Sequence, residues 1–290
     1  AEVLPKIEYR EFFSFIRSLH RWLAFEGDAR TIGKNIVAIS TIACIILTIG
    51  GVIVYWSRVK NNFLKSFTFS FKSKNRAFLS TMHSAIGMWV VPFFLLMCFT
   101  GLYWSYDWYR SAMFTVMQVE QPKRATPITQ VVKSVEQKDN KVVKEENSEK
   151  QPELISYENA QKVADIFNQN VSRDYKNANL RLTPSKDGIY TISYLYADAT
   201  HFRESNSMEI DPNKSLVVKE AKFEDKKLNE QLMSSMLPLH SGEYFGWFGQ
   251  LAYFISSALM ALFVITGYML YFDRWKKKRA KALKEKQVNL

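Results

Sequence analysis

Cysteine is scarce in this sequence, and its two cysteines, Cys44 and Cys98, lie in separate apolar runs. A disulfide framework is therefore not expected, and one thiol in each run does not make a metal site. We interpret both cysteines as small packing residues. A basic start followed by a short apolar core, the pattern of a secretory signal peptide, is also lacking. Because the first residue is Ala1, we expect the chain to begin either after a processing cut or part-way along a longer protein.

Charge is missing from three long stretches, residues 36–56, 80–106 and about 244–272. About 20 apolar residues cross a bilayer, so each stretch predicts a transmembrane helix. Acidic residues are missing from 57–76, which is rich in Lys and Arg. Short basic loops stay in the cytoplasm, and the chain after residue 272 is basic as well. This orientation accounts for the net charge of +11, and we expect no nucleic-acid partner.

The region outside the expected spans has two parts. Residues 121–153 are polar, with almost no aromatic residues, which is typical of a linker. From Leu154 on, a helix that Ser156 can cap is followed by alternating apolar and polar runs separated by turn residues. This pattern predicts one helix packed against about four antiparallel strands.

The expected fold is a mainly α membrane protein, a transmembrane helical bundle with a small extracytoplasmic α+β domain. Apolar side chains at helical spacing in the first residues predict an amphipathic helix at the membrane interface. The expected order is an extracytoplasmic interfacial amphipathic helix (1–30), a transmembrane helix (31–56), a basic cytoplasmic loop (57–76), a transmembrane helix (77–106), an extracytoplasmic linker (107–153), the α+β domain (154–236), a transmembrane helix with a histidine at its outer face (237–272) and a basic cytoplasmic tail (273–290).

An internal repeat links the first and last of these spans. Residues 49–58, IGGVIVYWSR, and 265–274, ITGYMLYFDR, share Ile, Gly, Tyr and Arg at the same positions. A Leu-His pair precedes each copy and contains His20 or His240. If the repeat is complete, a further spanning helix and outer domain precede Ala1, and the full protein has four spans. A genuine three-helix protein is the alternative.

The four histidines are the candidates for chemistry. His20 and His240 are equivalent in the repeat and fall at the outer face, where two imidazoles on facing helices can ligate one haem iron from both sides. His83 lies near the inner face, where the missing helix would supply its partner in a second haem. Simple hydrogen bonding at helix ends is the alternative for these three. We expect His201 to be an ordinary surface residue. Zinc is disfavoured because no Cys, Asp or second His stands three or four positions after any of them.

Three segments resemble the PepSY-associated transmembrane family, which includes haem-containing inner-membrane ferric-siderophore reductases. They are LHRWLAFEGDARTIGKNIVAISTIACIILTIGGVIVYW, RAFLSTMHSAIGMWVVPFFLLMCFTGLYWSYDWYR and LPLHSGEYFGWFGQLAYFISSALMALFVITGYMLYFDRW. Residues 154–222 resemble the PepSY module itself. The resemblance implies four spanning helices, haem bound through membrane histidines and reduction of iron chelates on the periplasmic side. His20, His83 and His240 stand at the family's Leu-His or Met-His positions.

Together these observations predict a transmembrane haem protein of the bacterial inner membrane, multi-pass, with its soluble domain in the periplasm. It would pass electrons from the cytoplasmic side to ferric siderophores or other iron chelates, as a haem-dependent reductase in iron uptake. The haem would be b-type, two per full-length protein, with His20, His240 and His83 as iron ligands. A separate flavoprotein or quinol would donate electrons. The alternative is a non-enzymatic, membrane-anchored PepSY regulator or peptidase-inhibitory protein, and a transporter component is a third possibility.

Overall fold

The computed structural model describes residues 8–71, 75–122, 156–185 and 187–288. The chain divides into two compact units, one formed by Ala1–Arg110 with Met236–Leu290 and the other by Ser111–Ser235. Long helices dominate the first unit, and the second contains a four-stranded antiparallel sheet. The expected fold class, a mainly α membrane protein with a small α+β domain, is confirmed.

The first unit is helical throughout its regular elements. They are α1 (Arg10–Trp22), α2 (Ala29–Asn61), the short 3-10 helix η1 (Leu64–Phe67), α3 (Asn75–Leu102), α8 (Met236–Ser241), the 3-10 helix η2 (Glu243–Phe245) and α9 (Gly246–Val288). A further helix, α4 (Asp107–Val116), runs across the boundary between the units.

Within the part of the chain that the structure describes, three segments are long and apolar enough to cross a membrane: Ala29–Asn61, Arg76–Leu102 and Glu243–Leu283. Large apolar side chains remain uncovered on them; Leu47 is 75% exposed and Val54 is 83% exposed. A helix that is apolar on all sides is typical of a membrane span, because lipid rather than protein covers its surface. The chain is therefore a multi-pass membrane protein.

Several element boundaries differ from the sequence-based expectation. α9 continues past Phe272 to Val288, because the basic segment is made of good helix formers without Gly or Pro. The expected linker, 107–153, begins with α4, while its residues 123–153 lie outside the described chain. His240 does not belong to the third spanning helix. It lies in α8, and Gly242 and Gly246, both with positive φ, separate α8 from α9.

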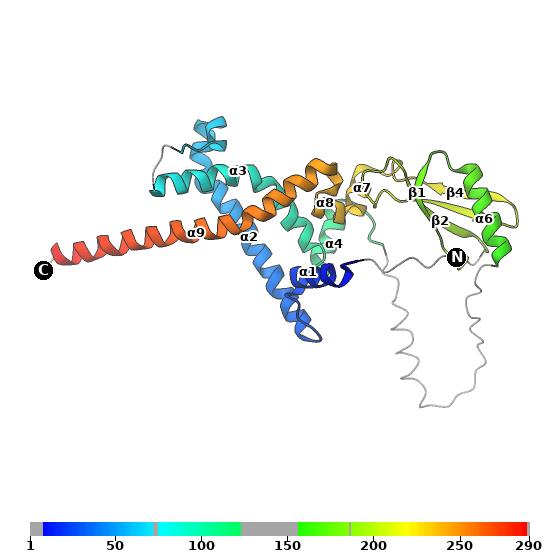
Figure 1. Cartoon of the computed structure of the whole chain (residues 1–290), viewed down its shortest axis with the longest axis horizontal. Helices are drawn as coiled ribbons and strands as arrows, with labels where there is room; N and C mark the ends of the chain where they lie inside the picture. The colour runs from blue at the N-terminus through cyan, green and yellow to red at the C-terminus, as the bar shows by residue number, and fades with distance from the viewer. Residues whose placement is uncertain (1–7, 72–74, 123–155, 186, 289–290) are drawn as a thin grey trace, which may run out of the picture. The chain divides into compact units, whose positions relative to one another are not determined.

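α3 occupies a central position in the first unit. It packs against α2, α8 and α9, while α1 packs against α2 (Figure 1). The buried apolar residues Ala85, Val90 and Phe94 of α3 lie in these contacts. Cys44 of α2 and Cys98 of α3 are free, partly buried thiols whose side chains lie near each other, a proximity that the sequence did not reveal.

The second unit is built on a meander of four antiparallel strands in the order β1-β2-β3-β4. Its elements are α6 (Tyr157–Asn170), β1 (Tyr175–Leu180), β2 (Tyr190–Tyr196), β3 (Asn206–Asp211), β4 (Leu216–Ala221) and α7 (Leu228–Ser234). As expected, Ser156 caps α6 by accepting a hydrogen bond from the backbone N–H of Asn159 at 3.2 Å.

α6 covers one face of this sheet and closes its core (Figure 1). Alternate residues of β2, including Tyr190, Ile192 and Tyr194, point to the same face, as the period of a strand requires. The core contains Val163, Ile166, Phe167, Tyr190, Ile192, Tyr194, Tyr196, Met208 and Ile210. A single helix on a four-stranded sheet is therefore enough to bury a continuous apolar cluster.

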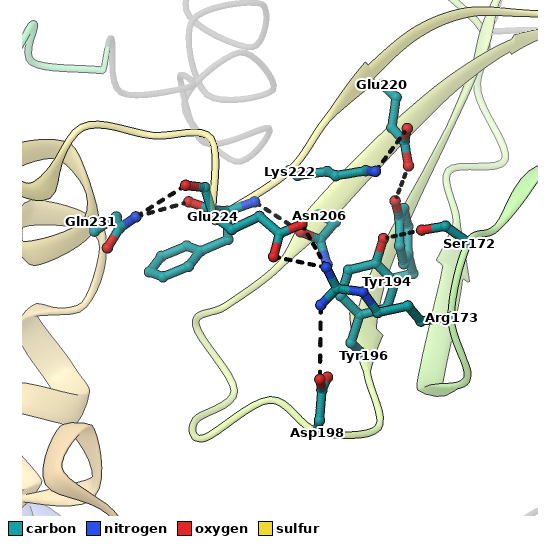
Figure 2. A network of polar contacts seen from close by, with 11 residues as sticks. Ser172, Arg173, Tyr194, Tyr196, Asp198, Asn206, Glu220, Lys222, Glu224 and Gln231 are labelled. Atoms are coloured by element: carbon teal, nitrogen blue, oxygen red, sulfur yellow. Dashed lines mark hydrogen bonds and ion pairs between the residues drawn. The ribbon is translucent and has the colours of Figure 1, made fainter.

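A polar network fixes the chain between β4 and α7 (Figure 2). The Nη2 group of Arg173 donates to both carboxylate oxygens of Glu224, at 2.9 and 3.0 Å, and the guanidinium lies 4.9 Å from the centre of the Tyr196 ring. The side-chain oxygen of Asn206 accepts from the backbone N–H of Phe223 at 2.8 Å. Because these contacts tie the segment after β4 to residues of the sheet and of the loop before β1, we interpret the network as structural.

Candidate functional site

The rings of His20 and His240 lie close together in the first unit, with their centroids 6.1 Å apart and their planes at 46°. His20 lies in the last turn of α1, and His240 lies in α8. α1 packs against α2, and α8 packs against α3, which brings together two elements from distant parts of the sequence. The structure therefore juxtaposes the two histidines that the internal repeat made equivalent.

The position of His20 depends on a tight junction between α1 and α2. α1 ends where Leu23 adopts a left-handed conformation and its backbone N–H bonds to the carbonyl of Leu19. The chain then turns back, so that the guanidinium of Arg30 lies 3.8 Å from the centre of the Trp22 ring. A Cβ atom on Gly33 would collide with the carbonyl group of Trp22, so the two helices can approach this closely only at a glycine.

His240 is held in one orientation by two acceptors on α3. Its Nδ1 lies 3.0 Å from the carbonyl oxygen of Met97 and 3.0 Å from Oγ1 of Thr100. A carbonyl oxygen can only accept, so Nδ1 carries the proton and Nε2 of the neutral ring keeps its lone pair. The indole of Trp104 packs edge-on against the imidazole at 5.6 Å. Nε2 is thus the nitrogen available for a metal or a proton.

His240 is neutral at ordinary pH. Burial lowers the pKa of its imidazole to about 4, the charge on His20 acts in the same direction, and the Met97 carbonyl opposes both. A neutral imidazole is the form that binds a metal, since protonation would occupy the ligand lone pair. The electrostatic surroundings of His240 therefore agree with its hydrogen bonds.

The turn between α8 and α9 fixes the other end of this site. Gly242 has φ +81°, and a Cβ there would meet the backbone of Gly249 and the ring of Tyr253. The Tyr253 hydroxyl donates a buried hydrogen bond of 2.9 Å to the carbonyl of Leu239, the residue before His240. α9 thus anchors α8 directly beside the histidine.

The spacing of the two rings fits one metal ion between them. A histidine nitrogen lies about 2 Å from a bound transition metal, which puts the centres of two opposed imidazoles roughly 6 Å apart. The observed separation is 6.1 Å. Among the described residues, no group of three or more His, Cys, Asp and Glu is placed to hold a metal ion. A histidine pair fits a metal that brings its other ligands with it, as haem iron does.

His83 lies apart from this pair, in the first half of α3. Its Nδ1 is 2.7 Å from Oγ1 of Thr266 on α9, and its ring meets Phe263 edge to face at 5.2 Å. Between His83 and Thr100, α3 rises roughly 25 Å, most of the hydrocarbon thickness of a bilayer. The structure does not bring His83 to the pair, and its role as a ligand remains a prediction.

The expectation that His201 is a surface residue is wrong. The residue is only 3% exposed, and its ring packs edge-on against Phe223 at 5.8 Å. Its Nδ1 accepts from the backbone N–H of Arg203 at 3.2 Å, and its Nε2 lies 3.6 Å from the carboxylate of Glu204. The loop after β2 folds over the ring, and no local sequence pattern marks such burial. His201 serves the structure of the second unit.

Sequence reasoning overlooked Thr100 and Thr266, the hydroxyls that contact His240 and His83. Each threonine is followed by a glycine, Gly101 or Gly267. The signal that would have found the threonines is the recurrence of a Thr-Gly dipeptide in two spans that each carry or follow a histidine.

The fold and the histidine pair define a multi-pass helical membrane protein with a small α+β domain inserted before its last span. The PepSY-associated TM region family matches residues 1–274, and the chain belongs to this family. None of the curated proteins with which the chain was compared matches it.

Proposed function

We propose that the protein is a transmembrane haem protein that passes electrons from the cytoplasmic side to ferric chelates outside the cytoplasm. It would act as a ferric-siderophore reductase in iron uptake. The observation that carries this proposal is the 6.1 Å separation of the His20 and His240 rings, on two separate elements of the first unit. Family membership supports the membrane setting but does not specify the chemistry.

His20 and His240 would hold one b-type haem, and His83 would contribute to a second. When bound, haem would supply one-electron chemistry, and its coordination by both histidines would leave no open site for small ligands, which suits electron transfer. Met97 and Thr100 hold the His240 ring with Nε2 free, and Trp104 packs against the same ring. Burial of His240 keeps it unprotonated at neutral pH.

The charge distribution supports one orientation in the membrane. Arg58 and Lys60 lie in the last turn of α2, Lys65 follows that helix, and the end of α9 is basic as well. Short basic segments remain in the cytoplasm. The histidine pair and the second unit would then lie on the periplasmic side of a bacterial inner membrane. There the second unit would position the chelate, and a separate flavoprotein or quinol would donate electrons near His83.

The first test is the absorption spectrum of the purified full chain, with a pyridine haemochrome assay for haem content. His240→Ala and His20→Ala should each remove the haem held by the pair, because a single axial histidine leaves the iron weakly held. His201→Asn is the matched control, since this histidine lies in the second unit. A folded, colourless wild-type protein, or a His240→Ala variant with unchanged haem, would contradict the proposal, and the first result would favour a non-enzymatic regulator.

A separate assay tests the direction of electron transfer across the membrane and the ferric chelate that is reduced. In right-side-out vesicles given an internal reductant, the wild-type protein should reduce an external ferric siderophore, detected by trapping Fe(II) with a chromogenic chelator. His240→Ala should lose this activity and His201→Asn should keep it. Reduction only from the opposite face would contradict the proposed orientation while leaving the haem assignment intact.

A further inference from the structure

His240 and His83 each lie against a Thr-Gly pair on a neighbouring helix. Thr100 of α3 lies 3.0 Å from Nδ1 of His240, which precedes α9. Thr266 of α9 lies 2.7 Å from Nδ1 of His83, which belongs to α3. α3 packs against both α8 and α9, so α3 provides this dipeptide to the histidine of α8, and α9 provides it to the histidine of α3. Two copies of one contact among these packed helices indicate a common role.

The hydrogen bonds that the threonine hydroxyls make within their own helices leave them as acceptors toward these rings. Thr100 Oγ1 lies 2.6 Å from the carbonyl of Leu96, and Thr266 Oγ1 lies 2.7 Å from the carbonyl of Leu262. Two oxygens this close need a proton between them, and a carbonyl has none to donate, so each hydroxyl proton points back to its own helix. The remaining lone pairs of Oγ1 therefore receive the N–H of the imidazole. At both sites the proton is placed on Nδ1, which leaves Nε2 unprotonated.

The glycines allow the rings to lie against the helix backbone. A Cβ on Gly101 would come within 3.1 Å of Cε1 of His240, which is tighter than an ordinary contact. A Cβ on Gly267 would lie 3.9 Å from Cε1 of His83, which is an ordinary contact. The threonine thus sets the tautomer of the ring, and the glycine sets how closely the ring can approach the helix backbone. A side chain in place of the glycine would be tolerated less well at His240 than at His83.

His201 provides an internal contrast because no Thr-Gly pair faces it. Its Nδ1 accepts from the N–H of Arg203, so the proton of its neutral ring lies on Nε2, toward Glu204. This is the opposite tautomer from that at His83 and His240. Local surroundings, and not a general preference of the ring, therefore set the position of each proton.

We propose that Thr100-Gly101 and Thr266-Gly267 are matched positioning devices that present Nε2 of His240 and Nε2 of His83 as ligand nitrogens at two levels of the membrane. The assignment of tautomers stands on the hydrogen bonds alone, whereas its use in holding haem iron rests on the proposed function. Partners of this kind, which orient a ligand through its second nitrogen, are typically worth about 10- to 100-fold in metal affinity.

The direct test is nitrogen-15 NMR of the full chain in detergent, without haem and with labelled histidine. Wild-type His83 and His240 should show protonated Nδ1 and unprotonated Nε2, and His201 the reverse. Thr266→Val, which keeps the shape but removes the hydroxyl, should give His83 a mixture of tautomers. Thr100→Val should shift His240 less, because the Met97 carbonyl still accepts from Nδ1. Thr266→Ser should restore the wild-type pattern.

Thr41→Val and Thr81→Val are the matched controls. Both threonines donate to a carbonyl of their own helix, at 2.8 Å in each case, and neither hydroxyl bonds to a histidine. Neither control should change any histidine tautomer. Wild-type tautomers at His83 in Thr266→Val would overturn the proposal, as would equal changes in the control variants.

A second measurement remains if a valine variant does not fold. Gly101→Ala should weaken haem binding about 10-fold or more, while Gly267→Ala should bind almost as wild type, because their Cβ positions differ in clearance. Equal affinities in the two alanine variants would overturn the glycine part of the device. A colourless wild-type protein that shows the expected tautomers would instead contradict the proposed function and leave the positioning devices standing.

Discussion

The backbone carbonyl of Trp22, at the end of α1, occupies the position that a Cβ atom on Gly33 of α2 would take. Gly33→Ala should therefore push α1 away from α2 and move His20 out of reach of His240. Overpacking of this kind costs about 1–3 kcal/mol of stability. We expect a lower thermal unfolding midpoint in detergent and loss of the haem that the histidine pair is proposed to hold.

Gly51→Ala is the control for this change. Gly51 belongs to the same helix, and nothing lies within 4 Å of the Cβ position there. Alanine favours a helix by up to about 1 kcal/mol over glycine, so this variant should be as stable as the wild type or slightly more stable. Similar unfolding midpoints for the two alanine variants would contradict the close contact between α1 and α2.

Much of the fold could be predicted from the sequence because membrane spans leave a strong signal. Uncharged runs mark α2, α3 and α9, and alternating runs mark the sheet. The helices α4 and α8 were missed, because short helices are determined by their tertiary contacts and by glycines such as Gly242 rather than by periodicity. The burial of His201 was missed because it depends on a loop that closes over the ring.

The site was predictable only in part, and for a physical reason. The internal repeat paired His20 with His240 because equivalent positions in related helices fall at the same depth. The orientation of a ring depends on neighbours that are distant in the sequence, such as Met97 and Thr100 for His240. A linear pattern does not contain these contacts, so the tautomer could be read only from the structure.

A second prediction concerns the anchor of α8. Tyr253 is 4% exposed, and its hydroxyl donates to the carbonyl of Leu239 at 2.9 Å. Tyr253→Phe leaves this buried carbonyl without its donor, which costs about 1–3 kcal/mol. The thermal unfolding midpoint should fall. Tyr268→Phe, on the same helix but 63% exposed, should have no effect. Indistinguishable midpoints for these variants would show that the hydrogen bond does not anchor α8.

A third prediction concerns the acid stability of the second unit. Burial would raise the pKa of the Asp211 carboxyl, but the backbone N–H groups of Lys214 and Asn213 and the Lys214 ammonium together lower it. A carboxyl whose pKa is lower in the folded state stabilises the fold at pH values above its pKa in the unfolded state, which is about 4. This stabilisation is lost as the pH falls through the pKa of the folded state. Asp211→Asn should remove this part of the pH dependence.

Pulse proteolysis of the full chain in detergent measures the stability of the second unit as a function of pH, from the cleavages identified between residues 157 and 221. Between neutral pH and about pH 3, the Asp211→Asn variant should lose less stability than the wild type, although it starts from a lower value. Asp165→Asn, at an exposed position of α6, should follow the wild-type profile. Parallel profiles for wild type and Asp211→Asn would refute the role of this carboxylate.

The last prediction uses the buried His201. His201→Ala leaves a cavity beside Phe223 and removes the acceptor of the Arg203 N–H, so we expect a loss of about 1–3 kcal/mol in the second unit. In His201→Asn, the amide oxygen can take the place of Nδ1 and accept from the same N–H, which should recover much of the loss. Proteolysis with the cleavages mapped distinguishes the two variants.

His20→Ala is the counterpart among the exposed histidines. It removes a ring that is exposed on α1 and leaves the second unit unchanged, so cleavage between residues 157 and 221 should match the wild type. The two variants should therefore separate two effects: His201→Ala should lower stability with no effect on haem content, and His20→Ala should lower haem content with little effect on stability. A His201→Ala protein as resistant to proteolysis as His20→Ala would show that the imidazole of His201 contributes nothing to the packing of its loop.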